Sequence, residues 1–134
     1  MSIEVLQPAE WAKPKGYANG MSARGRLIFT SGQVGWNANC EFTSDVLADQ
    51  VRETLRNIIR VLHEGGAQPR HLVRLTWFVR SRDAYYREIR EIGAAYREVI
   101  GKHFPAMSVL EVSALMEQRA LVEIEATAVV PDDE

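Results

Sequence analysis

The segment from Leu121 to Val130 constrains the fold more than any other part of the chain. Alternate residues along it are all apolar: Val122, Ile124, Ala126, Ala128 and Val130. The residues between them, such as Glu123 and Glu125, form a mixed set of charged, polar and apolar side chains. Because successive side chains of a β-strand point to opposite faces of a sheet, this segment predicts a strand with one face in a core.

Five more segments have the composition of β-strands and are bounded by Gly, Pro or polar residues. They are residues 3–6, 17–23, 26–31, 72–79 and 107–115. The pair Arg24-Gly25 predicts a turn that joins the second and third of these strands into a hairpin. The Gly- and Asn-rich segment 32–41 predicts a loop, since these residues accept positive φ angles.

Two longer segments have the periodicity of amphipathic helices. In the first, residues 45–63, apolar side chains recur at spacings of four, three and four and therefore line one face. These side chains are Val51, Leu55, Ile58 and Leu62. A polar cap from residues 43–45 and the pair Gly65-Gly66 mark its ends. The second helix is predicted over residues 83–100, with Ser81 or Asp83 as its cap.

The order of these elements predicts an α+β fold, β-β-β-α-β-α-β-β, in which two helices cover one face of a sheet. The length of 134 residues suits a single domain that spans residues 1–134. Opposite the helices, the sheet is predicted to carry a further set of apolar side chains: Met107, Val109, Leu115, Leu121 and Val129. We predict that copies of the chain pack together through this face. The alternative is a monomer with a solvated sheet face, which antiparallel sheets allow.

Composition narrows the classes of function. A formal net charge of −2, without a Lys/Arg cluster beyond residues 80–82, argues against nucleic acid as a partner. The single cysteine, Cys40, excludes an internal disulfide and favours a reducing compartment. No signal peptide or membrane-spanning run is visible, so we expect a cytoplasmic protein without a membrane partner. The histidines lack the spacing of metal ligands, so we expect no metal site.

Five sequence blocks stand in an order and spacing that resemble a known family. They are Gly16-Tyr17, residues 30–35 (Thr-Ser-Gly-Gln-Val-Gly), residues 73–79, Phe104-Pro105-Ala106 and residues 122–126 (Val-Glu-Ile-Glu-Ala). With them the chain resembles the Rid (YjgF-type, RidA-like) family of enamine/imine deaminases over nearly its whole length. The resemblance implies a chorismate-mutase-like fold and a homotrimer whose sheets form a central barrel, with ligand clefts between neighbouring subunits. It also implies hydrolysis of reactive enamines and imines to 2-keto acids and ammonia, without a cofactor.

Three functional positions of the family match this sequence. Glu123 corresponds to the catalytic glutamate that orients or activates water. Tyr17 and Ser31 correspond to residues that hold the small-molecule ligand. Each also has a structural interpretation, because a glutamate can pair with arginine across an interface, and hydroxyl groups often bond to backbone.

Three other positions depart from the family pattern. The arginine that clamps the substrate carboxylate is Met107 here, the cysteine two residues later is Val109, and an asparagine on the second helix aligns with Gly93. A guanidinium binds a carboxylate through two parallel charge-assisted hydrogen bonds, which a thioether cannot make. The usual small 2-imino acids are therefore not the expected substrates.

Two explanations can account for the missing arginine. Either Arg80 or Arg119 reaches the pocket in its place, or the ligand is less anionic and more apolar. In the second case Met107, Val109 and Trp36 would form an apolar wall around the ligand.

The sequence thus predicts a homotrimeric hydrolase acting on C=N bonds of a substrate other than simple 2-imino acids, for example a 2-aminomuconate-like dicarboxylate. One alternative is a non-catalytic trimer that binds or senses a metabolite, which the missing arginine favours. A second is an endoribonuclease, which the net charge of −2 disfavours.

Overall fold

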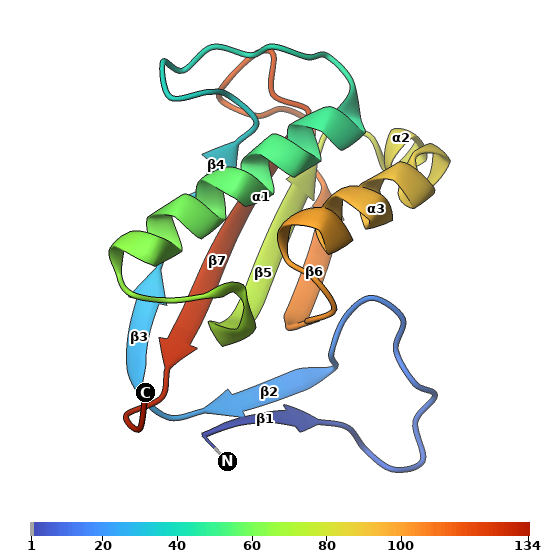
Figure 1. Ribbon diagram of the computed structural model, residues 1–134. Helices are drawn as coiled ribbons and strands as arrows, with labels where there is room; N and C mark the ends of the chain where they lie inside the picture. The colour runs from blue at the N-terminus through green and yellow to red at the C-terminus, as the bar shows by residue number, and fades with distance from the viewer. Residues whose placement is uncertain (1) are drawn as a thin grey trace.

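A five-stranded sheet carries two long helices on one of its faces (Figure 1). This computed structural model describes residues 2–134. The strand order is β3 (Arg26–Phe29), β7 (Val122–Val130), β5 (Leu72–Val79) and β6 (Ala106–Glu111), and the short β4 (Gln33–Val34) also pairs with β7. All pairs are antiparallel except β5 with β6, which run parallel. The predicted order of helices and strands is confirmed, with β4 added in the segment predicted as a loop.

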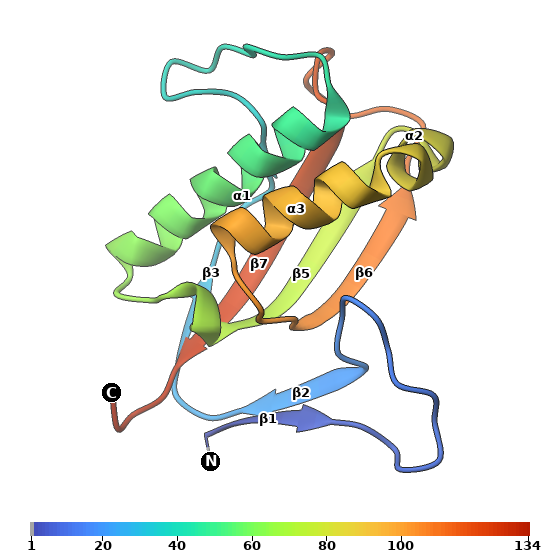
Figure 2. The same ribbon diagram turned by 45° about the vertical axis from the view of Figure 1, so that its right-hand side comes forward.

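The helix α1 (Leu47–Glu64) packs across β7 and lies beside α3 (Ile89–Val99) on the same face of the sheet (Figure 2). The apolar face predicted for α1 is confirmed, since Val51, Leu55, Ile58 and Leu62 have no exposed surface. Gly65 and Gly66 follow the last turn, and Gly66 has a φ of 79°. The predicted polar cap is wrong: Val46 precedes the helix, and Ser44 accepts from the Val46 amide instead of from a helical one.

The second predicted helix is divided into α2 (Arg82–Arg87) and α3 at Glu88. Ser81 caps α2 as predicted, because its hydroxyl accepts a hydrogen bond from the Ala84 amide at 3.0 Å. The Glu88 carboxylate accepts from the backbone amide of Ala48 at 3.1 Å, in the first turn of α1. The interruption of the second predicted helix therefore coincides with a hydrogen bond that joins Glu88 to α1. A 3₁₀ turn, η1 (Pro69–His71), leads into β5.

The alternation predicted for the last strand is confirmed. Its five apolar positions, Val122, Ile124, Ala126, Ala128 and Val130, are all buried beneath the helices. Glu125 is exposed on the opposite face, and Glu123 is partly exposed. The strand is central in the sheet, so its apolar face unites the core formed by α1, α3 and β5.

The face predicted for β6 is wrong. Met107 and Val109 pair in register with Leu75 and Trp77, whose side chains are buried on the helix side of β5. They therefore face α3. The predicted strand over residues 107–115 ends at Glu111, so Leu115 lies beyond it, and Leu121 packs against the helix-side core. The face without helices carries Val129, as predicted, but its other apolar side chains are Leu27, Phe29, Phe78 and Leu110.

The N-terminal strands form a separate two-stranded sheet of β1 (Ile3–Leu6) and β2 (Gly20–Ala23). The predicted hairpin is wrong, because β2 pairs with β1 while β3 pairs with β7. Gly25 lies between the two sheets with a φ of 150°, and a Cβ there would fall 2.2 Å from the Val130 carbonyl oxygen. The chain can pass this close to β7 only because residue 25 has no side chain.

Candidate functional site

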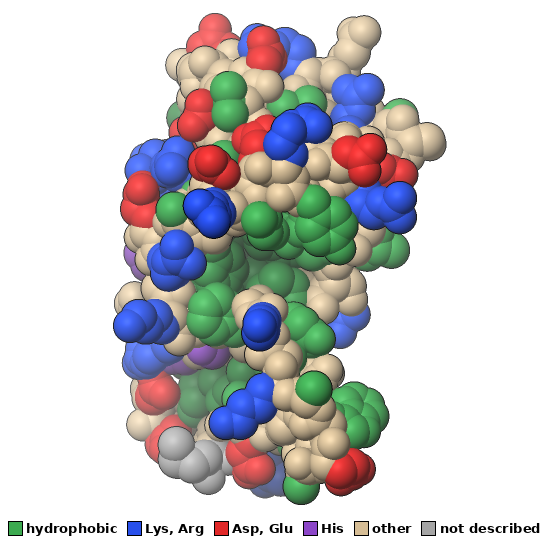
Figure 3. All heavy atoms as spheres, turned by 90° about the vertical axis from the view of Figure 1, so that its right-hand side faces the viewer, with side chains coloured by type: hydrophobic (Ala, Val, Ile, Leu, Met, Phe, Trp, Pro, Cys, Tyr) green, Lys and Arg blue, Asp and Glu red, His purple; other side chains and the backbone are tan. Residues whose placement is uncertain are grey.

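A half-open cavity of about 520 Å³ lies between α3, the strands β5 and β6, and the segment that begins at Lys15. From this side of the molecule, hydrophobic side chains gather in a hollow with charged side chains around it (Figure 3). Met107 and Val109 form part of its floor, next to Trp77. Its size is within the range of pockets that bind small molecules.

Aromatic rings form much of the cavity wall. Trp77 stacks on Tyr96 with ring centres 6.5 Å apart and meets Tyr85 edge-on at 6.4 Å. Tyr96 in turn stacks on Phe104 at 5.4 Å, with the two rings only 9° from parallel. Such offset and edge-to-face contacts are favoured by the charge distribution of aromatic rings, and they hold the wall rigid.

The polar atoms of this wall differ in whether they have a hydrogen-bond partner. Tyr96 donates its hydroxyl to the His103 carbonyl oxygen at 2.6 Å. Burial raises the pKa of Tyr96 and of Tyr85 above the ordinary value of 10, so both phenols stay neutral at physiological pH. The indole Nε1 of Trp77 is buried and has no hydrogen-bond partner among residues 2–134. A buried N–H without a partner is uncommon and costs free energy.

Tyr17 reaches the cavity because the next residue, Ala18, is hydrogen-bonded to the chain at the beginning of β6. The Ala18 amide donates to the Pro105 carbonyl oxygen at 3.0 Å, and Ala18 bridges Ala106. Gly16, with a φ of 79°, turns the chain just before. Tyr17 is 42% exposed, so its ring borders the opening of the cavity.

Glu123 and Ser31 do not line this cavity within one chain. Glu123 pairs with Phe78 on the face of the sheet without helices. A Cβ on Gly32 would lie 2.0 Å from a carboxylate oxygen of Glu123, so the acid rests against the backbone next to Ser31. Ser31 itself accepts a hydrogen bond from Gln33 at 3.1 Å. The matched family positions are thus divided between two places on the chain.

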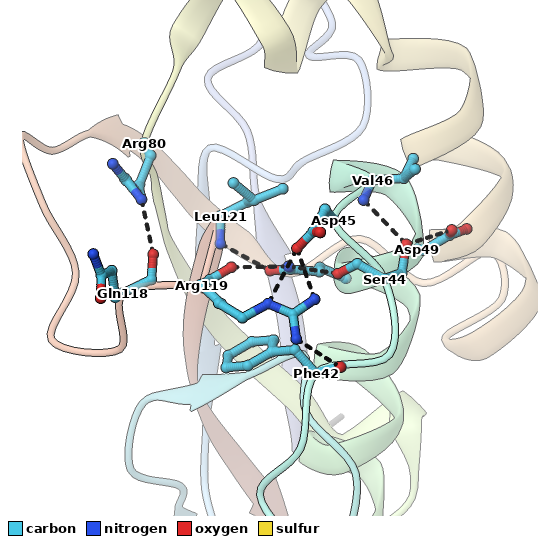
Figure 4. A network of polar contacts seen from close by, with 10 residues as sticks. Phe42, Ser44, Asp45, Val46, Asp49, Arg80, Gln118, Arg119 and Leu121 are labelled. Carbon is cyan, nitrogen blue, oxygen red and sulfur yellow. Dashed lines mark hydrogen bonds and ion pairs between the residues drawn. The ribbon is translucent and has the colours of Figure 1, made fainter.

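Of the remaining predicted ligand residues, Gly93 lines the cavity and the others do not. Trp36 packs against Phe42, with ring centres 5.7 Å apart, and Asn57 donates to its carbonyl oxygen. Arg80 donates to the Gln118 carbonyl oxygen at 3.1 Å (Figure 4).

Arg119 belongs to the same polar network (Figure 4). Its guanidinium donates twice to one carboxylate oxygen of Asp45, at 2.8 and 3.2 Å, and once to the Phe42 carbonyl oxygen. The guanidinium carbon also lies 5.7 Å from the centre of the Phe42 ring. Both arginines considered as substitutes for the missing clamp are therefore engaged in contacts outside the cavity.

The sequence reasoning missed the two charged residues that do line the cavity, Lys15 and Arg97. Arg97 lies one helical turn after Gly93, and its Nη1 is 3.3 Å from where a Cβ on Gly93 would be. The spacing of four residues on a helix was the signal that could have predicted this contact.

The sheet with helices on one face defines an α+β fold of the chorismate-mutase-like class. The family model described as Endoribonuclease L-PSP matches residues 9–130, and the chain belongs to this family, which includes the YjgF and Rid proteins. A conserved Rid-family protein from Yersinia pestis, described as of unknown function, has a similar structure. The TM-score is 0.84 and the identity 31%, over 97% of this chain and 100% of that one.

Curated relatives support the same assignment. A RutC family protein of Haemophilus influenzae is 34% identical over 106 residues, which cover 78% of this chain and 80% of the relative. The 2-iminobutanoate/2-iminopropanoate deaminase of Escherichia coli K12 is 33% identical over 109 residues, with the same two coverages. The chain is therefore similar to an imine deaminase.

No group of three or more His, Cys, Asp or Glu among residues 2–134 could hold a metal ion. None of the helices in this range combines the length and the apolar content needed to cross a bilayer.

Proposed function

We propose that the protein is a homotrimeric enamine/imine hydrolase that releases ammonia from a substrate other than simple 2-imino acids. The observation that carries this proposal is the division of the site between two surfaces of one chain. Tyr17 borders the cavity, whereas Glu123 rests beside Ser31 on the face of the sheet without helices. A complete site then requires Glu123 and Ser31 from a neighbouring copy.

The apolar side chains on that face support the association of copies. Leu27, Phe29 and Leu110 are 57%, 66% and 46% exposed in the single chain. Exposed apolar side chains gathered on one sheet face are typical of a protein–protein interface. Three chains of 15.1 kDa would give a particle of about 45 kDa, which light scattering can measure. A particle with the mass of one chain would contradict the proposal.

The proposed chemistry needs only water and acid–base groups. Water adds to the carbon of the C=N bond while Glu123 accepts a proton from it, and the nitrogen gains a proton. The tetrahedral intermediate then breaks its C–N bond, which yields a C=O group and ammonia. Tyr17 and Ser31 would hold polar groups of the substrate during these steps, and no cofactor is required.

A direct test measures ammonia release from imines that an amino-acid oxidase generates freshly from different amino acids. We expect Glu123→Gln to lower turnover by about 100-fold or more, because a general base contributes at least this much. Glu125→Gln is the matched control, since Glu125 lies two residues further along the same face of the same strand. Equal turnover by the Glu123 variant and the unmodified protein would refute the assigned role.

A second variant tests the explanation for the unusual substrate. Met107 lines the cavity where the family arginine is expected. In Met107→Arg, a restored pair of charge-assisted hydrogen bonds should raise kcat/KM for 2-iminopropanoate by about tenfold or more. An unchanged value would mean that the cavity differs from the family site in more than this residue.

The absence of the family arginine at position 107 also favours a second candidate, a non-catalytic trimer that binds a metabolite. Such a protein would bind a small molecule in the cavity but hydrolyse none of the imines tested. The endoribonuclease activity that the family description names is a weaker candidate for this chain, because its net charge is −2. RNA cleavage by pure protein that disappears in Glu123→Gln would favour it. We propose a cytoplasmic location, with which the single cysteine agrees.

A further inference from the structure

Within a single chain, the charges that line the cavity are all of one sign. Lys15 and Arg97 line it, and no Asp or Glu of residues 2–134 does. Neither cation forms an ion pair or a side-chain hydrogen bond with another residue in that range. Both side chains are exposed at the border of an apolar pocket, where cations without acidic partners attract an anion.

The guanidinium of Arg97 lies close to Gly93. The Nη1 atom lies 3.3 Å from the place that a Cβ on residue 93 would occupy, so any side chain there would crowd the guanidinium. The glycine therefore leaves room for the arginine to lie along the cavity wall. By contrast, Arg80 and Arg119 already donate to acceptors of their own chain.

The remainder of the cavity suits a flat apolar group. Trp77 and Tyr85 present rings at 86° to each other, and Ile89 and Val109 add aliphatic surface. A cavity of about 520 Å³ is far larger than a three- or four-carbon acid, which would leave most of this wall in contact with water.

We propose that this cavity binds a carboxylate that bears an aromatic ring, with Arg97 as the carboxylate-binding residue in place of the missing family arginine. The ring packs against Trp77 and Tyr85, and Lys15 adds a second positive charge at the opening. The proposal deepens the proposed function, on which it rests for the identity of the reaction: the substrate class becomes the 2-imino acids derived from aromatic amino acids.

Three stable compounds test the two halves of this proposal by isothermal titration calorimetry on the intact protein. The probe 3-phenylpropanoate carries both the ring and the charge, propanoate lacks the ring, and 3-phenylpropanamide lacks the charge. We expect 3-phenylpropanoate to bind at least about tenfold more tightly than either of the others. An amide that binds as tightly as the acid, or propanoate that binds as tightly as 3-phenylpropanoate, would overturn the proposal.

Substitution of the arginine assigns the charge recognition. Arg97→Gln should weaken 3-phenylpropanoate by about tenfold or more and leave the amide unchanged. Arg90→Gln is the matched control, because Arg90 is exposed on the same helix and does not line the cavity. The same acid affinity in Arg97→Gln and in the unmodified protein would exclude Arg97 as the clamp.

A spectroscopic measurement tests the ring-binding wall. The chain has three tryptophans, so an amide correlation spectrum should contain three indole N–H signals. The signal absent in Trp77→Phe belongs to Trp77 and should shift when 3-phenylpropanoate is added, whereas the Trp11 and Trp36 signals should not. A Trp77 signal that does not move at saturation would contradict binding at this wall.

These binding measurements separate the inference from the proposed function. Binding as expected, without ammonia release from any imine, would refute the hydrolase and leave the ligand class intact. Hydrolysis of small imines by a protein that binds 3-phenylpropanoate no better than propanoate would refute only the ligand class.

Discussion

Two regions of this molecule carry arginines beside aromatic rings, and they use them in opposite ways. The first region is the junction between the beginning of α1, around Gln50, and the segment before β7. There Arg119 lies over Phe42 and is paired with Asp45. In the cavity beneath α3, Arg97 has no acidic partner among residues 2–134. An arginine whose guanidinium already has hydrogen-bond and ion-pair partners supports the fold. An arginine without an acidic partner next to a cavity is available to a ligand.

The junction is organised by a buried glutamine. Gln50 is 1% exposed and uses its whole amide group. Its Nε2 donates to the carbonyl oxygens of Ser44 and Arg119, at 2.9 and 3.0 Å, and its Oε1 accepts from the Leu121 amide at 2.8 Å. It therefore joins the beginning of α1 to the segment that enters β7. The Trp77 indole in the cavity, equally buried, lacks any such partner.

The largest change in stability is expected for a substitution of Gln50 in the junction. Gln50→Ala removes the hydrogen-bond partner of three backbone groups in a partly buried network, so the free energy of unfolding should fall by about 2–4 kcal/mol. Urea denaturation measures this change. The control Gln118→Ala, an exposed side chain in the same connection, should change it by less than about 0.5 kcal/mol. Similar losses in both variants would show that the glutamine network does not stabilise the fold.

A substitution of Gly93, next to Arg97, should change the free energy of unfolding in the opposite direction. Gly93→Ala should raise the free energy of unfolding by about 0.5–1 kcal/mol, because alanine favours the helix over glycine. The new methyl group would crowd the Arg97 guanidinium, whose Nη1 lies 3.3 Å from that position, so affinity for 3-phenylpropanoate should fall by about twofold at most. Thermal denaturation and calorimetry measure the two effects. Ala94→Gly, at an exposed position next to it, should lower stability without a change in affinity. Loss of stability in Gly93→Ala would contradict this expectation, and unchanged affinity would show that the Arg97 guanidinium binds without the space that Gly93 leaves.

The smallest effect is expected for the arginine of the junction. Arg119→Gln should lower the free energy of unfolding by only about 0.5 kcal/mol, since its pair with Asp45 is largely exposed. Affinity for 3-phenylpropanoate should stay the same. If instead Arg119→Gln weakens this probe as much as Arg97→Gln does, the two regions are not functionally distinct, and Arg119 reaches the ligand in the assembled protein.

Much of the fold could be predicted from periodicity within single segments. The strands β5 and β7, the helix α1 and the cap of α2 agree with the sequence because each depends on residues close together in the chain. The hairpin of residues 17–31 was wrong, since two adjacent strands of similar composition can pair with each other or with distant partners. Here β3 pairs with β7, about a hundred residues later.

The candidate site was predictable only in part for the same reason. The family motifs indicated Tyr17, Gly93 and Met107, which the structure brings to one cavity. They also suggested Arg80 and Arg119 as replacements for the clamp, because a sequence does not reveal which charges already have partners. Arg97 was overlooked, although it follows Gly93 by one helical turn.

Motif order and local periodicity were enough to predict the family, the central strand with its apolar face, and the long helix that covers it. Those features follow from the repeat of side chains along one element, which the chain encodes locally. Contacts between distant segments emerge only in three dimensions: β6 turns Met107 and Val109 towards α3, and Arg97 has no acidic partner there among residues 2–134. The physical reason is distance along the chain. The parallel pairing of β5 with β6 and the hydrogen bonds of Arg80 and Arg119 each connect segments that are far apart in the sequence.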